Sequence, residues 1–276
     1  MRVLKSPVRH FGIPGLVLTW ALSTLACASE RTAFDKQSSE PGDKIVFAYW
    51  SEAPEPLGQA TIPNDRREGL IRDMSRLIAE ALGKKAVFKP LPGGRIQPDL
   101  VGGNIDMNCL SSPKWGVQPT PIKWTIPIFH GGEGPIMRAD EADAVVKFES
   151  LIGKRISLYE KYTYDGPLRT LIDGGQIEVT TVDTLDRGLE LLQLNRIDAH
   201  IEFSSVAHSR LERSEYSEVL KVAPLQTDTF GYSCAVAHRF AGHLDDINTF
   251  IRTAQQNGQI SGLLHKYHLP ESMIED

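Results

Sequence analysis

The fold of this chain is set by residues 67–110, REGLIRDMSRLIAEALGKKAVFKPLPGGRIQPDLVGGNIDMNCL. Its first part predicts an amphipathic helix, because apolar side chains recur on one face at the 3.6-residue period. Gly83 follows as a left-handed helix stop, with Lys84 and Lys85 beside the carbonyl end. The apolar residues of this helix are Leu70, Ile71, Met74, Leu77, Ile78, Ala81 and Leu82.

The second part of the stretch predicts a strand, a short helix and another strand. Ala86–Phe88 is a short apolar run, a second helix ends at Gly102-Gly103, and Ile105–Leu110 forms the next strand. Strands that alternate with helices build a parallel sheet covered by helices, so the sequence predicts the α/β class.

The N-terminal residues 1–28 are predicted to be a signal peptide. Arg2, Lys5 and Arg9 precede an apolar stretch, Phe11 to Ala26, that is too short and too rich in Gly and Pro for a comfortable membrane span. The sequence allows two alternative processing sites at the end of this signal peptide. Ala26-Cys27-Ala28 fits a cleavage site, whereas Thr24-Leu25-Ala26-Cys27 resembles a lipobox that would place a lipid on Cys27. Residues 29–43 are polar and aperiodic, as a flexible linker would be.

The charge of the chain argues against a nucleic-acid partner. The whole sequence has a formal charge of −5, and residues 1–26 carry three basic residues and no acid, so the remainder has a charge of −8. An acidic protein without a basic stripe lacks the electrostatic surface that nucleic acids require.

Only Cys109 and Cys234 remain in the folded part of the sequence. An oxidising compartment permits a disulfide between them. The alternative is a pair of buried free thiols that pack as small apolar residues, and the sequence favours this alternative.

The pattern restarts after residue 138 and predicts a second helix-and-strand unit. Its strands are expected at Arg155–Tyr159, Glu178–Val182 and Ile197–Phe203. Leu192–Ala199 repeats the order of Leu100–Met107, in which a helix end is followed by Asn and then by Ile-Asp at the start of a strand. The segment Ser111–Phe129 holds four prolines with Trp115 and Trp124, and we expect it to pack against a sheet.

The last part of the sequence predicts a return to the first unit. Phe230–His238 is expected to pair beside Gly134–Arg138, so that two strands connect the halves, and two amphipathic helices then pack on the first half. The predicted domains are lobe 1, residues 44–133 and 234–276, and lobe 2, residues 134–233.

This order of parts resembles the family 3 extracellular solute-binding proteins, the polar-amino-acid receptors of bacterial ABC importers. The matching features are Gly69-Leu70 and Asp73-Met74 before the long helix, Gly103 with Ile105-Asp106 closing the first unit, Asn195 to Ala199, and the C-terminal stretch Gln256–Tyr267. The resemblance implies a periplasmic, monomeric receptor with two α/β lobes joined by two hinge strands. It also implies a small polar solute, an ABC permease as partner, no cofactor, no metal, and no membrane contact beyond a lipid anchor.

The predicted binding site lies at the carboxyl ends of the strands, where open parallel sheets bind ligands. The amino-acid clamp of the family is altered here, because Gln118 stands near the usual Arg and Phe203 near the usual Asp. Arg95 or Lys114 is therefore expected to supply positive charge. The candidate ligand-binding residues are Tyr49, Trp50, Arg95, Ser111, Ser112, Lys114, Tyr162, Thr163, Glu202 and Phe203.

Two other functions remain open from the sequence. Some dehydratases resemble these receptors, and Glu202 or Glu160 in a closed cleft would be the general acid of such an enzyme. The other alternative is a receptor that senses a ligand without transport. The sequence contains no G-x-S-x-G, P-loop, C-x-x-C or H-E-x-x-H motif, and His265 with His268 lacks a third metal ligand nearby.

Overall fold

The computed structural model describes residues 42–58, 68–116, 121–160 and 162–274, and residues 39–276 form one compact unit. The predicted signal peptide, Cys27, nearly all of the linker, and Gln118 lie outside the described residues. Within the described residues, no helix has the length and apolar character needed to cross a membrane.

The stretch that decided the fold class forms the first parallel sheet. Strand β1 (Lys44–Trp50) lies between β2 (Lys85–Leu91) and β3 (Met107–Ser111), and both neighbours run parallel to it. Helix α1 (Leu70–Ala81) connects β1 to β2, and α2 (Gly93–Val101) connects β2 to β3. Helix α1 buries Leu70, Ile71, Met74 and Ile78 of the predicted apolar face, while Leu77 and Leu82 are half-buried and Ala81 is exposed. Gly83 has the left-handed φ of 64° expected at the end of the helix.

A second parallel sheet repeats this arrangement. Strand β6 (Arg155–Tyr159) lies between β7 (Glu178–Val182) and β8 (Ala199–Phe203). The helices of this part are α3 (Ala139–Ala142), α4 (Gly166–Asp173), α5 (Leu185–Gln193) and α6 (Ser204–Glu212).

The Ile-Asp pair that is repeated in the sequence has the same geometry in both sheets. Asp106 Oδ2 accepts a hydrogen bond from the backbone N–H of Val46 at 2.8 Å, and Asp198 Oδ2 accepts one from the backbone N–H of Arg155, also at 2.8 Å. Each aspartate therefore fastens the start of one parallel strand to the neighbouring strand.

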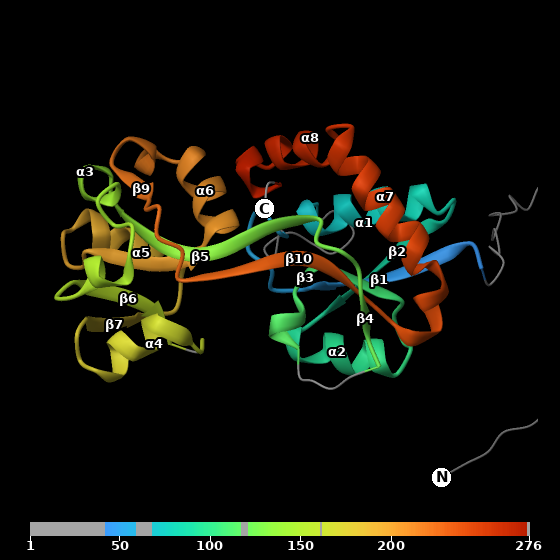
Figure 1. Cartoon of the computed structure of the whole chain (residues 1–276), viewed down its shortest axis with the longest axis horizontal. Helices are drawn as coiled ribbons and strands as arrows, with labels where there is room; N and C mark the ends of the chain where they lie inside the picture. The colour runs from blue at the N-terminus through green and yellow to red at the C-terminus, as the bar shows by residue number, and fades with distance from the viewer. Residues whose placement is uncertain (1–41, 59–67, 117–120, 161, 275–276) are drawn as a thin grey trace, which may run out of the picture. The chain divides into compact units, whose positions relative to one another are not determined.

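Two long strands join the sheets, as Figure 1 shows. Strand β5 (Phe129–Arg138) pairs antiparallel with β10 (Asp228–Val236), and β10 continues into the first sheet beside β3 and β4 (Lys123–Trp124). The other end of β5 pairs with β8 and with β9 (Leu220–Val222).

The predicted pairing of these two strands is wrong in detail. Strand β10 pairs with Phe129–Glu133 of β5, whereas residues 134–138 pair with β8 on one side and β9 on the other. Strand β5 also begins five residues before the predicted Gly134. The sequence did not indicate the start of β5, because Gly131 and Gly132 have no side chains and so show no alternation of apolar and polar residues. A Cβ at Gly131 would lie 2.5 Å from the ring of Tyr232, so the close pairing of the strands requires glycine there.

The buried apolar residues form separate cores on the two sheets. The clusters around the first sheet come from residues 45–129 and 230–273, and those around the second come from residues 136–225. We call these parts the first and second lobes. The C-terminal helices α7 (Leu244–Gln256) and α8 (Gln259–Lys266) pack on α1 in the first lobe. The numbered boundaries of the predicted lobes stay a prediction.

Cys109 and Cys234 form a disulfide with an S–S distance of 2.06 Å. We expected free thiols, and the structure instead joins them. The reason is tertiary: β3 and β10 are adjacent antiparallel strands, and their register shifts between Ser233 and Ala235, next to both sulfur atoms.

Candidate functional site

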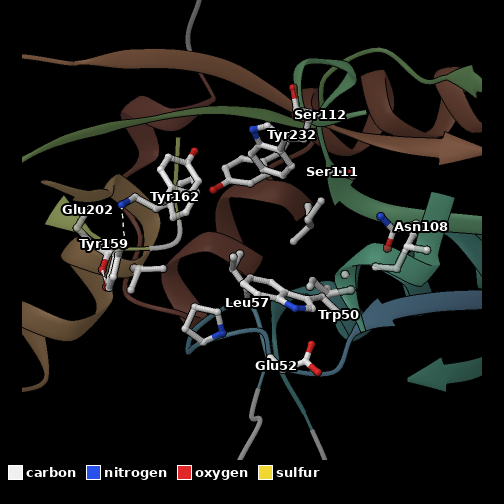
Figure 2. Close-up of a pocket in the computed structure, with 18 of the residues that line it drawn as sticks. Trp50, Glu52, Leu57, Asn108, Ser111, Ser112, Tyr159, Tyr162, Glu202 and Tyr232 are labelled. Carbon is white, nitrogen blue, oxygen red and sulfur yellow. Dashed lines mark hydrogen bonds between the residues drawn. The ribbon is translucent and has the colours of Figure 1, made fainter. Parts of the chain in front are cut away.

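A cavity of about 1220 Å³ lies at the carboxyl ends of the parallel strands and is lined by residues of both lobes. Trp50 ends β1, Ser111 ends β3 and Ser112 follows it, Tyr159 ends β6, and Glu202 with Phe203 ends β8. Figure 2 shows Trp50 and Glu52 on one side of the cavity and Tyr159, Tyr162 and Glu202 on another. The position agrees with the rule that places ligands outside the carboxyl ends of parallel strands.

Aromatic rings from both lobes meet in this cavity. Trp115 of the first lobe packs edge-on against Phe203 of the second, with 6.1 Å between ring centroids, and against Tyr232 of β10 at 5.9 Å. Tyr162 in turn lies 5.9 Å from Phe203. Edge-to-face contacts of this kind favour a fixed arrangement of the rings.

Glu202 is a buried carboxylate at the wall of the cavity, held by two donors. The Tyr159 hydroxyl donates to its Oε2 at 2.5 Å, and the backbone N–H of Phe203 donates to its Oε1 at 2.7 Å. Behind it, His200 Nε2 lies 3.8 Å from Oε2, and Nδ1 of the same ring hydrogen-bonds with Ser157 Oγ at 2.8 Å. This chain of contacts fixes the direction of the carboxylate.

A second buried carboxylate, Glu133 of β5, lies in a small adjoining pocket that Glu202 also lines. The Tyr162 hydroxyl donates a hydrogen bond to it. Burial raises the pKa of Glu133 to about 7, and the nearby Asp228 and Glu202 add to the rise, while the Tyr162 hydrogen bond opposes it. Burial and the Glu202 carboxylate likewise raise the pKa of Tyr159 far above its ordinary value, so this phenol stays a donor.

Among the described residues of the cavity wall, acidic side chains outnumber basic ones. The two basic residues in this described part are Arg210 in α6 and Arg213 at the end of α6. Arg210 lies 2.8 Å from Asp186, and Arg213 lies 2.8 Å from Glu55. The acidic residues of the wall are Glu52, Glu55, Glu160, Asp183, Asp186 and Glu202.

The structure places six of the ten candidate ligand-binding residues in the wall of this cavity: Trp50, Ser111, Ser112, Tyr162, Glu202 and Phe203. The other four are not among its lining residues. Tyr49 is 2% exposed and packs in the core against Phe88, because the side chains of β1 alternate between the faces of the sheet. Thr163 is exposed outside the wall.

Arg95 and Lys114, the two cations expected to attract a solute, are paired elsewhere. Arg95 on α2 lies 3.2 Å from Asp99, one helical turn further on. Lys114 Nζ lies 2.8 Å from Asp228 and also donates to the carbonyl of Thr229, so it ties the segment after β3 to β10. Neither residue lines the cavity.

Several residues of the wall were not among the candidate ligand-binding residues chosen from the sequence. Tyr159 had a signal, since it ends a predicted strand. Trp115 was expected only to pack against a sheet, and its aromatic partners come from β8 and β10, which a linear pattern does not bring together. Asn108 and Tyr232 lie within strands, so only the register of those strands decides which way they face.

The described residues contain no group of three or more His, Cys, Asp or Glu side chains arranged to hold a metal ion. Chemically, the cavity offers hydroxyls, an amide, aromatic faces and oriented carboxylates. Such a wall can bind a small polar solute by hydrogen bonds and ring contacts.

Comparison with known proteins gives a clear result for the fold. No protein-family model and no curated protein sequence matches the chain. Solved structures do match. An ancestral arginine-binding protein bound to arginine has a TM-score of 0.59 at 20% identity, over 82% of this chain and 98% of that one. The L-cystine solute receptor of Neisseria gonorrhoeae, unliganded and open, has a TM-score of 0.64 at 16% identity, over 82% and 92%.

A third match is an ancestral amino-acid-binding protein described as a precursor of cyclohexadienyl dehydratase. Its TM-score is 0.58 at 17% identity, over 82% of this chain and 95% of that one. The chain therefore has the two-lobed α/β fold of amino-acid-binding solute receptors, as the resemblance in its sequence predicted.

Proposed function

We propose that this protein is a periplasmic receptor that closes over a small polar solute and delivers it to an ABC-type importer in the inner membrane. The observation that carries the proposal is the cavity itself, whose wall combines the strand ends of both lobes. A solute that contacts both lobes favours their closed arrangement, because it binds that state more tightly than the open one.

The proposed solute contacts are Trp50, Ser111, Ser112 and Tyr162 together with Glu202 and Phe203. These residues supply hydroxyl groups, ring faces and one carboxylate, the mixture of apolar wall and few polar groups that is typical of small-molecule sites. The receptor is expected to act as a monomer, with the permease as its membrane partner.

A thermal-shift screen against amino acids, polyamines, small carboxylates and sugars tests the receptor proposal. A ligand at about 100 times its dissociation constant adds about 2.7 kcal/mol to the free energy of unfolding. For a chain of this size the melting temperature is then expected to rise by about 5–10 °C. A folded, ligand-free protein that responds to no compound in the screen would contradict the proposal.

A dehydratase-like enzyme is the second candidate, favoured by the third structural match and by the oriented Glu202 carboxyl group. Mass analysis separates the two candidates. A receptor returns its ligand unchanged after hours with stoichiometric protein, whereas an enzyme converts it to a product. Uptake of the labelled ligand by cells with and without this protein separates transport from sensing.

A further inference from the structure

We propose that the solute of this receptor is an organic cation, an amine or a quaternary ammonium compound, that is bound without a clamp for an α-carboxylate. This inference rests on the proposed function and deepens it, since it names the chemical class of the solute. Three separate features of the cavity carry it: its exposed aromatic rings, its excess of carboxylates, and the pairing of the nearby cations with carboxylates of the protein.

The first feature is the placement of exposed aromatic rings. Trp50, Trp115 and Tyr162 are 38%, 43% and 39% exposed. Every other Phe, Tyr and Trp side chain among the described residues is less exposed than these three, and all three line the same cavity. A cation placed over the face of such a ring gains about 0.5–2 kcal/mol from it.

The second feature is the charge of the wall. Among the described residues, six carboxylates and two guanidinium groups line the cavity, and each guanidinium is paired with one of those carboxylates. Glu52, Glu160 and Asp183 form no ion pair within the described part of the chain. Glu202 accepts from the Tyr159 hydroxyl and from a backbone N–H, with His200 Nε2 3.8 Å behind it. The described part of the wall therefore presents net negative charge to a solute, which attracts cations and repels anions.

The third feature is that the cations of the protein near the cavity are already paired with its own carboxylates, so they are not available to a carboxylate of the solute. An α-carboxylate is best held by a bidentate arginine. In the described part of the wall, both arginines are occupied by carboxylates of the protein. Arg95 and Lys114 point to Asp99 and Asp228 outside the wall. Among the described residues, the wall offers the carboxylate of a zwitterionic amino acid no unpaired guanidinium, whereas a simple cation needs none.

The test measures affinity by titration calorimetry with matched pairs of probes. Choline is compared with its neutral isostere 3,3-dimethylbutan-1-ol, putrescine with 1,4-butanediol, and agmatine with L-arginine. In at least one of the first two pairs the cation is expected to bind 100-fold or more tightly than its neutral partner. Agmatine is expected to bind more tightly than L-arginine, which carries the same guanidinium and adds a carboxylate.

Variants then locate the bound cation. Trp115→Leu removes a ring face but keeps apolar bulk, and it is expected to weaken cation binding by about 10- to 30-fold, whereas Trp115→Phe should restore most of the affinity. Glu202→Gln keeps the shape and acceptor of the side chain and should weaken binding by at least 10-fold. Glu149→Gln, an exposed acid that does not line the cavity, is the control and should leave affinity unchanged.

The outcomes separate this inference from the receptor function. Preferential binding of an α-amino acid, a carboxylate or a sugar would overturn the cation inference and leave the receptor proposal standing. Binding of no probe of any class would overturn both. Cation binding that is equally strong in the Trp115→Leu and Glu202→Gln proteins would overturn the placement of the cation in this cavity.

Discussion

Glu133 illustrates how one residue can oppose the stability of the fold that holds it. Its side chain is 6% exposed on the connecting strand β5, close to the carboxylates of Asp228 and Glu202. The Tyr162 hydroxyl satisfies one of its oxygens, but a hydrogen bond from a neutral phenol offsets only part of the cost of burying a charge. The native protein therefore holds a proton on Glu133 that the unfolded chain releases.

We expect Glu133→Gln to remove a pH dependence of stability. Because the native pKa is about 7 against an ordinary value of 4.5, the native state binds more protons than the unfolded state between these values. The free energy of unfolding therefore falls as pH rises through this window, by about 3 kcal/mol from this residue at 1.36 kcal/mol per pKa unit. Urea unfolding at pH 5 and pH 8 measures the difference between variant and parent.

The variant should match the parent at pH 5 and exceed its stability at pH 8. Glu149→Gln is the control, because Glu149 is exposed and its loss should leave the pH profile of the parent unchanged. Identical profiles for Glu133→Gln and the parent would show that Glu133 titrates normally.

At the scale of elements, the packing of α5 on β8 depends on one glycine. A Cβ built on Gly188 would lie 2.8 Å from Cγ and Nδ1 of His200, which is fully buried in β8. The ring cannot easily move aside, since its Nδ1 is hydrogen-bonded with Ser157 of β6. The same ring lies 3.8 Å behind Glu202, so a shift of α5 would be transmitted to the cavity wall through the His200 side chain.

Gly188→Ala is expected to destabilise the protein by about 1–3 kcal/mol, because overpacking at a buried contact outweighs the helix propensity of alanine. The matched control is Gly262→Ala in α8, where a Cβ would meet nothing within 4 Å. That variant should gain up to about 1 kcal/mol from propensity alone. Both effects are measured as shifts of the urea midpoint, and a stabilising Gly188→Ala would show that the His200 ring is free to move.

At the scale of the whole molecule, a disulfide closes a loop that contains the entire second lobe. Cys109 in β3 and Cys234 in β10 are 125 residues apart, and the bond fastens one of the two connecting strands to the first sheet. A loop of this length restricts the unfolded chain strongly, which corresponds to about 4–5 kcal/mol in the chain-entropy model.

We expect the double variant Cys109→Ala with Cys234→Ala to unfold with a free energy lower by about 3–5 kcal/mol and a melting temperature lower by roughly 10 °C. Parent protein refolded under reducing conditions should show a comparable loss, which controls for the missing sulfur atoms. If the parent is equally stable with and without reductant, the bond contributes nothing to its stability.

The sequence by itself determined the local features and the fold class. The apolar stripe of α1, the stop at Gly83 and the repeated Ile-Asp at the start of a strand are short-range patterns, so each can be found in one stretch of chain. The same patterns located the strand ends that line the cavity, because in a parallel sheet the position of a site follows from the order of the strands.

Only the tertiary structure decided the features that depend on register between distant strands. It set the pairing of β10 with the glycine-rich start of β5, the bond between Cys109 and Cys234, and the meeting of Trp115 with Phe203 and Tyr232. It also placed Arg95 and Lys114 against Asp99 and Asp228, away from the solute cavity. A shift of one residue turns a strand's side chains to the opposite face, and no pattern along the chain records that choice.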